Sequence, residues 1–210
     1  MTTSLPRRTL LRILGSAGAL VGLARPASAA LDPTPPQSAG PFYPPAADRF
    51  ADTDWDLVKV AGRVRAAGGE VMQLSGRVLG RDGAPVAGAL IEIWQCDANG
   101  RYLHSADVSA TRSRDPNFQG YGVTRSGGDG GYRFRTILPV EYPGRTPHIH
   151  ARIQRADATE LITQIYLAGH PLNQRDFLFR RLGRAAQAAA SITPTRRGDG
   201  DLEAGFDFVV

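Results

Sequence analysis

Cysteine is nearly absent from this sequence: Cys96 is the only one among 210 residues, so no disulfide bond can form within the chain. Stability must therefore come from side-chain packing or from a bound metal. Cys96 lies in a strand-like apolar run, which favours a small buried side chain over a reactive thiol. Histidine is also scarce, because the chain contains only four.

Acidic residues are missing from the first 30 residues, which contain four arginines, an apolar stretch over 13–24 and the triplet Ala-Ser-Ala at 27–29. This order is typical of a secretory signal. The apolar stretch is shorter than the roughly 20 residues that a membrane span needs. Arg7 and Arg8 stand within SLPRRTLLR, which resembles a twin-arginine export signal. An ordinary secretory signal that happens to contain two arginines is the alternative. We therefore predict a signal peptide over 1–30 and an exported protein, periplasmic or extracellular.

A large excess of one charge is absent once this segment is set aside. The whole chain carries 25 basic and 20 acidic side chains, a net charge of +5. Without the four arginines of residues 1–30, 21 basic and 20 acidic side chains remain. Nucleic-acid-binding domains usually carry a clear basic surplus. We therefore predict no nucleic-acid partner, and no membrane association after signal removal.

Internal repeats and a second domain boundary are not visible, so residues 31–210 are expected to form one domain. Its first part, 31–70, begins with the proline-rich string LDPTPPQSAGPFYPP, which predicts an extended arm. From 71 to 210, runs rich in Val, Ile and aromatics alternate with glycine-rich turns. This pattern predicts a mostly antiparallel β-sandwich. Apolar residues recurring at helical spacing predict one short helix between Asn173 and Ser191.

The most informative local pattern is His148-Ile149-His150. Side chains at positions i and i+2 of a strand point to the same face, about 6 to 7 Å apart, so both imidazoles can bind one ion. A structural or surface pair of histidines is the alternative. Pro147 favours extended backbone before the strand, and Tyr142 and Arg145 immediately precede it.

The residues near this pair suggest which metal it would bind. No cysteine lies near it in the sequence, and the tyrosines offer phenols, which are hard oxygen ligands once deprotonated. A trivalent ion lowers the pKa of a tyrosine, ordinarily about 10, enough for phenolate to bind at neutral pH. Iron(III) is the natural candidate. Zinc bound by the two histidines with Glu141 or Asp97 is the alternative, although no HExxH motif is present.

Longer strings resemble the intradiol ring-cleavage dioxygenases, and among them the protocatechuate 3,4-dioxygenases most. They are TPPQSAGPFYP, SGRVLGRDGAPVAGALIEIWQCDANGRY, DPNFQGYG, GYRFRTILPVEYPGRTPHIH, LITQIYLAG and the closing FDF. The resemblance spans nearly the whole chain after the signal. It implies a β-sandwich of the intradiol type and non-heme Fe(III) as cofactor. It further implies four metal ligands, which are Tyr102, Tyr142, His148 and His150.

The same resemblance assigns roles to further residues. Arg145 takes the position of an arginine that stabilises negative charge on the ring, and Gln164 that of a pocket glutamine near the oxygen site. A surface arginine and a solvent-facing glutamine are the respective alternatives. Trp94 is expected to form pocket wall or core. His104 and His170 are expected to be structural or exposed.

The resemblance also implies a reaction. A catechol displaces Tyr142 from the metal, and the released phenolate takes a substrate proton as a general base. Dioxygen attacks the activated ring, and Arg145 offsets the charge that develops. Ring opening between the two hydroxyl-bearing carbons gives a cis,cis-muconate-type diacid. The implied partners are a small aromatic diol and O2.

Two departures and one rival class complete the predictions. The loop between Tyr142 and His148 is shorter than in the protocatechuate 3,4-dioxygenases, and Gly144 stands where those enzymes have a tryptophan, so a wider pocket for substituted catechols is expected. The long N-terminal helical domain by which catechol 1,2-dioxygenases dimerise is missing, although another homo-oligomer is compatible with the sequence. The rival is a non-catalytic extracellular β-sandwich binding module, which DGAPVAGALIEIW resembles.

Overall fold

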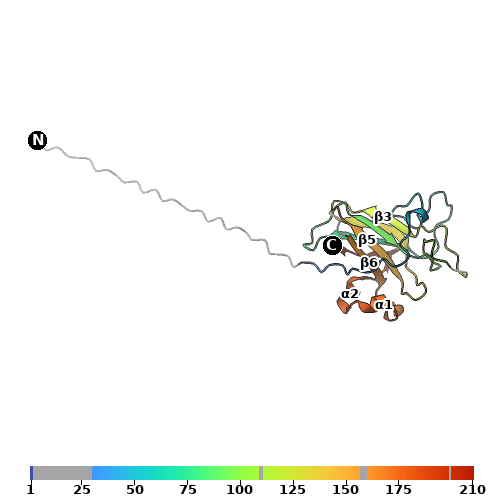
Figure 1. Ribbon diagram of the computed structural model, residues 1–210. Helices are drawn as coiled ribbons and strands as arrows, with labels where there is room; N and C mark the ends of the chain where they lie inside the picture. Colours follow the sequence, from blue (N-terminus) through green and yellow to red (C-terminus); the bar gives the residue numbers. More distant parts are fainter. Residues whose placement is uncertain (2–29, 109–110, 157–159, 199) are drawn as a thin grey trace.

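The computed structural model describes residue 1 and residues 30–108, 111–156, 160–198 and 200–210 (Figure 1). Two five-stranded sheets pack against each other, and short helices lie at one end. The predicted, mostly antiparallel β-sandwich is therefore confirmed. The predicted signal segment lies almost wholly outside the described residues. Within them, no helix has the length and apolarity needed to cross a membrane.

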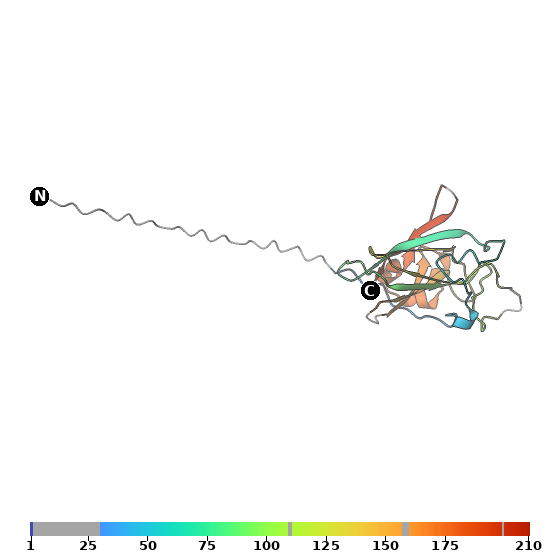
Figure 2. The same cartoon turned by 90° about the horizontal axis from the view of Figure 1, so that it is seen from above.

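The first sheet is built around β1 (Val71–Leu79). One side of β1 pairs antiparallel with β4 (Gly131–Ile137). The other side pairs parallel with β9 (Leu202–Gly205) and β10 (Phe208–Val209), and β8 (Thr195–Arg196) pairs antiparallel with β9. In Figure 2, β1 in teal lies beside the orange-red C-terminal strands.

Gly76 lies where β1 changes its pairing partner from β9 to β10, and the backbone of Phe206 between these two strands comes very close to it. A Cβ at this position would lie 1.8 Å from the carbonyl oxygen of Phe206. The Phe206 N–H donates to the Ser75 carbonyl at 2.9 Å, and the Arg77 N–H donates to the Asp207 carboxylate at 2.8 Å. Only glycine fits between these strands.

The second sheet has the order β3 (Tyr121–Arg125), β2 (Leu90–Trp94), β5 (His148–Gln154), β6 (Glu160–Leu167) and β7 (Ser191–Ile192). Its pairs are antiparallel except for β6 with β7. The sequence does not predict β3 as a separate strand, since its short run holds a glycine and few apolar residues.

The faces of the second sheet follow the alternation of its sequence. On β5, Ile149, Ala151 and Ile153 belong to the core between the sheets, whereas His148 and His150 point to the opposite face. A second, smaller apolar cluster covers that face. Its fully buried members are Trp94, Cys96, Tyr102, Leu103 and Tyr121. The histidines are therefore buried outside the main core.

Residues 31–45 contain no regular element and lie along the domain, as an arm does. Thr34 N–H donates to the carbonyl of Val209 at 3.0 Å, and Val209 N–H donates to the hydroxyl of Thr34 at 2.8 Å. Gln37 N–H donates to the carbonyl of Ile162 on β6 at 2.7 Å. The arm thus contacts both sheets before it reaches the short η1 (Ala46–Asp48).

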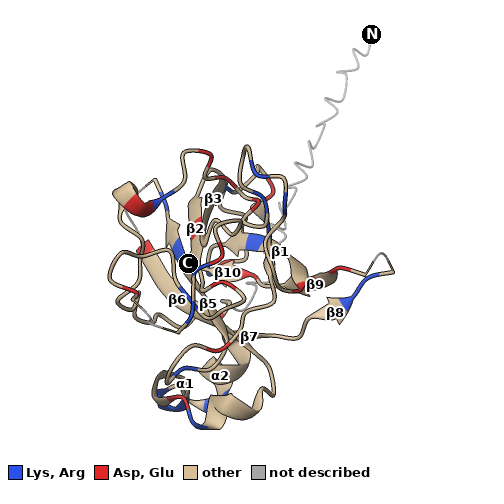
Figure 3. Cartoon of the chain, turned by 90° about the vertical axis from the view of Figure 1, so that its right-hand side faces the viewer, with Lys and Arg blue, Asp and Glu red and all other residues tan. Residues whose placement is uncertain are grey.

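The expected single helix near the C-terminus is two short helices, α1 (Phe177–Arg181) and α2 (Arg184–Ala189), after η2 (Pro171–Gln174). The break falls at Leu182, which is extended with ψ 135°. The side chain of Gln187 donates to the carbonyls of Phe179 at 3.1 Å and Leu182 at 2.9 Å, which satisfies the end of α1. Figure 3 shows both helices below the sandwich, apart from β8 and β9.

Candidate metal centre

Two imidazoles from β5 meet in the interior. Nε2 of His148 lies 3.1 Å from Nε2 of His150, and both side chains are at most 2% exposed. Burial, then the Arg145 charge, lowers the pKa of His148 to about 4. Burial, then His148, lowers the pKa of His150 well below its ordinary value. Both rings are therefore neutral at pH 7, which is the form that binds metals.

The two rings are oriented in different ways. Nδ1 of His148 lies 2.6 Å from the carbonyl oxygen of Thr146, so this nitrogen carries the proton and Nε2 presents its lone pair. The ring of His150 lies parallel to the indole of Trp94, with centroids 4.9 Å apart and an interplanar angle of 4°.

Two tyrosines stand beside the histidine pair. The hydroxyl of Tyr102 lies 3.4 Å from Nε2 of His148. The ring of Tyr142 is 5.1 Å from that of Tyr102 and 5.7 Å from that of His148. Tyr102 comes from the loop after β2, where its N–H donates to the Asp107 carboxylate at 2.5 Å. All four predicted ligands therefore lie together, although they come from three separate segments.

The tyrosines differ in their surroundings. Tyr102 is 1% exposed, and burial raises its pKa well above the ordinary value of 10.0. Tyr142 is half-buried on the loop between β4 and β5. Burial also raises the pKa of Tyr142, while Arg145, whose Nη1 is 3.5 Å from the phenol oxygen, acts to lower it. Tyr142 is thus the more accessible phenol.

This donor set fits a hard trivalent cation. Two nitrogens at about 2.1 Å from one ion and at right angles to each other lie about 3 Å apart, close to the observed Nε2 separation of 3.1 Å. Two phenols supply oxygen ligands of the kind that Fe(III) prefers. The residues present therefore fit non-heme Fe(III).

The zinc alternative lacks its carboxylate. Glu141 is exposed on the loop between β4 and β5, and its carboxylate forms no metal-binding group with the two histidines. The carboxylate of Asp97 accepts hydrogen bonds from the backbone of Asn99, Arg101 and Asp115. Within the described part of the chain, no cluster of three or more His, Cys, Asp or Glu side chains could hold a metal.

Arg145 and Gln164 are buried next to the phenols. Nη2 of Arg145 donates to Oε1 of Gln164 at 2.6 Å. Gln164 is fully buried, and its Nε2 donates to the carbonyl of Ser38 in the arm at 2.8 Å. The structure thus places neither residue on the surface, which was the alternative for each.

Asp176 was not identified from the sequence. Its carboxylate accepts hydrogen bonds from Arg145 Nε at 2.7 Å and from the Thr146 N–H at 3.0 Å, as well as from the first N–H groups of α1. Burial alone would raise the pKa of Asp176, but these N–H donors and Arg145 lower it below the ordinary 3.8. An Asp before an apolar helix predicts an N-cap, but it does not predict the ion pair.

The arm contributes residues that the sequence did not assign to the site. The ring of Phe42 stacks on Tyr102, with centroids 5.1 Å apart and an angle of 26°. The side chain of Gln37 accepts a hydrogen bond from the Tyr166 hydroxyl at 2.8 Å. Because the arm is far from these residues in sequence, no local pattern could have linked them.

The remaining singled-out residues, His104, His170 and Cys96, are not among the four candidate ligands. His104 is partly exposed and accepts a hydrogen bond from the Ala106 N–H at 3.0 Å. His170 caps η2. Cys96 is buried, and burial raises the pKa of its thiol to about 12, so it remains protonated at neutral pH.

A pocket of about 400 Å³ opens on this site. Its walls include Tyr142, Arg145 and Asp176, and its rim includes the rest of the 141–146 loop, Arg112, Leu172 and Arg175. Gly144 lies on this loop with φ +82°, and nothing lies within 4 Å of the position that a Cβ would take. The pocket is therefore open beside Gly144.

Comparisons with known proteins agree with this arrangement. The model of the dioxygenase family matches residues 39–210. The protocatechuate 3,4-dioxygenase beta chain of Burkholderia cepacia is 38% identical over 149 residues, which are 67% of this chain and 63% of the relative. The 6-chlorohydroxyquinol 1,2-dioxygenase of Cupriavidus pinatubonensis is 32% identical over 198 residues, 84% of this chain and 64% of the relative. The chain thus spans somewhat less than two thirds of either relative.

Solved structures show the same fold. The dioxygenase domain of a dioxygenase carbohydrate-binding protein fusion from Streptomyces sp. SirexAA-E has a TM-score of 0.65 and 34% identity. The match covers 85% of this chain and 98% of that domain. Hydroxyquinol 1,2-dioxygenase from Pseudomonas putida DLL-E4 has a TM-score of 0.64 at 23% identity, covering 85% of this chain and 66% of that one.

Proposed function

We propose that this chain, which belongs to the dioxygenase family, is a non-heme Fe(III) intradiol dioxygenase that opens catechol-type rings between the two hydroxyl-bearing carbons. Both atoms of O2 enter the product, a cis,cis-muconate-type diacid. The relatives named above are dioxygenases of dihydroxylated and trihydroxylated aromatics, which supports this substrate class. They give no support to the non-catalytic binding module.

The observation that carries the proposal is the meeting of two neutral imidazoles and two phenols in one buried cluster. Nε2 of His148 is the common neighbour, 3.1 Å from His150 Nε2 and 3.4 Å from the Tyr102 hydroxyl. Bound Fe(III) would supply Lewis acidity, which stabilises the phenolates and activates a catecholate toward O2. We assign Tyr102, Tyr142, His148 and His150 as its ligands.

The two phenols have different roles in this proposal. Tyr102 is fully enclosed, with Phe42 stacked on its ring, so it remains in place when substrate enters. Tyr142 is half-buried and faces the pocket. It can therefore yield its position to a catechol oxygen and take the proton of that hydroxyl on its own phenol oxygen, as a general base.

Arg145 holds a positive charge where the substrate ring becomes negative. It is 8% exposed, and its guanidinium bonds Asp176 through Nε and Gln164 through Nη2. These contacts fix its plane before substrate arrives, so its charge is preorganised toward the pocket. Gln164 is itself held in place, because its Nε2 donates to the carbonyl of Ser38 in the arm.

The pocket favours substituted rings. A volume of about 400 Å³ is in the range of pockets that bind ligands larger than a single ring. The open space beside Gly144 lies in the wall of this pocket. We therefore propose substituted catechols, together with O2, as the substrates.

Export is part of the proposal. The twin-arginine pattern at Arg7 and Arg8 supports transport of a folded, metal-loaded protein, with a mature domain that begins near residue 31. Lysine substitution of both arginines is expected to retain the unprocessed protein in the cytoplasm. N-terminal sequencing of the fractionated protein tests this, and unchanged processing would contradict the twin-arginine route.

The proposed activity is tested by oxygen uptake on catechol, protocatechuate and hydroxyquinol, with identification of the products. The purified protein is expected to contain iron and to show a tyrosinate-to-iron absorption band. Opening of the ring beside the hydroxyls rather than between them would contradict the proposal. So would an iron-free, colourless protein that takes up no oxygen after reconstitution with iron.

A further inference from the structure

The two metal-ligating imidazoles are not held by the same kind of contact. His148 is oriented by the hydrogen bond from its Nδ1 to Thr146. Nδ1 of His150 is buried and makes no hydrogen bond of normal geometry with the described residues, although the backbone of Ser38 in the arm lies near enough to this ring to act on its pKa, in the raising direction. A ligand ring without such a bond can turn about its Cβ–Cγ bond, which would move Nε2 away from His148. The Ser38 contact falls short of the bond that orients His148, so ring contacts must contribute to fixing the plane of His150.

Trp94 is placed to do this by the pairing of the strands. On the neighbouring strands β2 and β5, Trp94 stands directly opposite His150, so both side chains lie on the same face of the sheet. The two rings lie parallel, with centroids 4.9 Å apart and an angle of 4°. Gly40 of the arm also approaches this ring, since a Cβ there would be 3.2 Å from His150 Cε1.

The indole acts through its ring rather than through its N–H. Trp94 is fully buried, and its Nε1 has no hydrogen-bond partner among the described residues. A buried donor left without a partner is unfavourable, so ring contacts must account for a tryptophan at this position. Its contact with His150 is one of them, and its contact with Tyr43 is the other.

Tyr43 of the arm also contacts the indole of Trp94. The two rings meet edge to face, with centroids 4.9 Å apart and an interplanar angle of 84°. The Tyr43 hydroxyl donates to the carboxylate of Glu92 at 3.2 Å and accepts from Arg152 Nη1 at 3.2 Å. Glu92 also accepts from Arg152 at 3.3 Å and from the Tyr121 hydroxyl. Glu92 is 6% exposed, so this polar cluster is largely enclosed.

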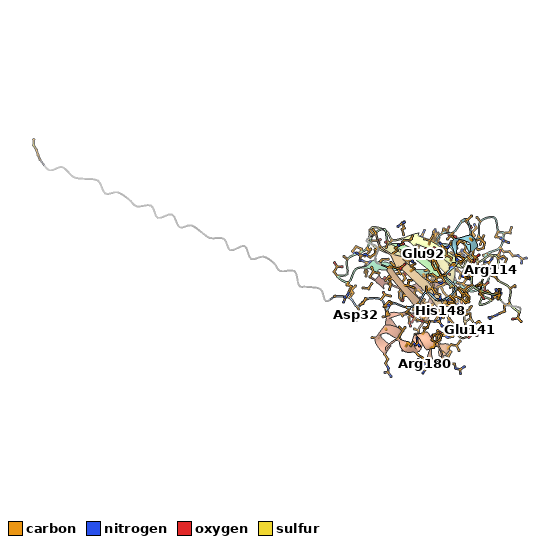
Figure 4. The ribbon with its side chains drawn as sticks, in the orientation of Figure 1. Asp32, Glu92, Arg114, Glu141, His148 and Arg180 are labelled. Atoms are coloured by element: carbon orange, nitrogen blue, oxygen red, sulfur yellow. The ribbon has the colours of Figure 1, made fainter. Side chains whose placement is uncertain are left out.

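Strand register joins the cluster to the metal site. Glu92 stands opposite Arg152, as Trp94 stands opposite His150 two residues further along the same two strands and on the same face. Figure 4 shows Glu92 and His148 on the same sheet. The ion pair and Tyr43 therefore hold the indole, and the indole holds the imidazole.

We propose that Trp94 is a positioning residue for His150, supported by Tyr43 and Glu92, and that it slows release of the bound metal by fixing the plane of this ligand. The inference rests on the proposed function for the identity of the metal. Groups that orient metal ligands typically change metal affinity by about 10- to 100-fold when they are lost.

The test compares Trp94→Leu, Trp94→Phe and the control Phe134→Leu, in the full chain purified with iron. Phe134 is a fully buried aromatic of the main core. The rate of iron loss to a chelator and the tyrosinate-to-iron band are measured. Trp94→Leu is expected to lose iron about tenfold faster with a shifted band. Trp94→Phe, which keeps an aromatic face, and Phe134→Leu should remain within about threefold of the parent protein.

A folded Trp94→Leu protein that releases iron at the parent rate would overturn the inference. If that variant does not fold, Tyr43→Leu replaces it, and an unchanged release rate there has the same meaning. Absence of iron from the parent protein would contradict the proposed function instead. In that case the rate of Zn²⁺ release is measured on the same variants, because the orientation of His150 by Trp94 should slow release of any metal that this imidazole binds. Faster Zn²⁺ release from Trp94→Leu would support the inference, and an unchanged rate would overturn it.

Discussion

The guanidinium of Arg145 is bound to the carboxylate of Asp176 at 2.7 Å, although the two residues are 31 positions apart in the sequence. Asp176 is 2% exposed and also caps α1. The start of a helix therefore orients the charge that lines the pocket. Displacement of α1 would move this guanidinium, which in the proposed reaction makes the ion pair a link between packing and catalysis.

Asp176→Asn is expected to lower kcat/KM for ring cleavage by about 100-fold, because a misplaced charge near the reacting centre has an effect of this order. Asparagine still caps the helix, so α1 should persist. Steady-state oxygen uptake and iron content give the measurement. Asp129→Asn, in an exposed turn, is the charge-matched control. Equal activity of the two variants would refute the link.

The same carboxylate predicts a pH dependence of stability. The pKa of Asp176 is lower in the folded protein than its ordinary value of 3.8. Its ionised form therefore stabilises the fold above pH 3.8, and this contribution is lost as the pH falls through the folded pKa. Chemical unfolding from pH 7 to 2.5 should show the difference between parent and Asp176→Asn shrinking at low pH. A stability difference that grows at low pH would contradict a lowered pKa of Asp176 in the folded protein.

Tyr142→Phe is expected to retain iron and to lower kcat by about 10²- to 10⁴-fold, the range for loss of a general base. Tyr102 and the histidines would still hold the metal. Single-turnover measurements of catechol binding and ring opening separate the two steps. The control is Tyr132→Phe, whose hydroxyl bonds the Phe206 carbonyl in the core. Full activity of Tyr142→Phe would remove this residue from the mechanism.

Iron removal is expected to lower the melting temperature. A ligand present at 100 times its dissociation constant stabilises the fold by about 2.7 kcal/mol. Differential scanning calorimetry before and after chelation measures the change. Iron should restore both stability and oxygen uptake, while zinc should restore stability alone. Oxygen uptake with zinc would contradict the assigned metal chemistry.

Gly76→Ala is expected to destabilise the protein by about 2 kcal/mol or more, since overpacking typically costs about 1–3 kcal/mol and the clash here is with backbone. The Cβ would lie 1.8 Å from the Phe206 carbonyl oxygen. Gly205→Ala is the matched control, because nothing lies within 4 Å of its Cβ position. Urea unfolding measures the free energy of unfolding of both variants. Equal losses of stability would mean that the backbone between β9 and β10 can shift to make room for the Cβ.

Local patterns predicted the sandwich and the pairing of His148 with His150, because alternation decides which side chains share a face of a strand. They did not predict how the strands are ordered. The stacking of Trp94 on His150 depends on β2 lying next to β5. In the sequence, 55 residues stand between Trp94 and His150. The same reason explains why Asp176 was predicted neither as a partner of Arg145 nor as part of the site.

The helix prediction was right in its place and wrong in the number of helices, for a local reason. The apolar spacing between Asn173 and Ser191 is helical, yet Leu182 and Gly183 adopt extended backbone and a second helix begins at Arg184. A side-chain amide, Gln187, satisfies the carbonyls at the break. The spacing of apolar residues does not reveal a side-chain hydrogen bond that replaces the backbone bonds at a helix end.

Thr34 and Val209 are joined by two hydrogen bonds, which brings the two ends of the domain together. Mechanical tension applied between the ends would act on this contact together with the outermost backbone bonds, from Leu31 to Arg81 and from Val210 to Leu79. Peeling of the arm would next withdraw the Ser38 carbonyl from Gln164. In a domain tethered at both ends, release of the arm would therefore disturb the contacts of Gln164 and Arg145 before the strands β5 and β6 separate.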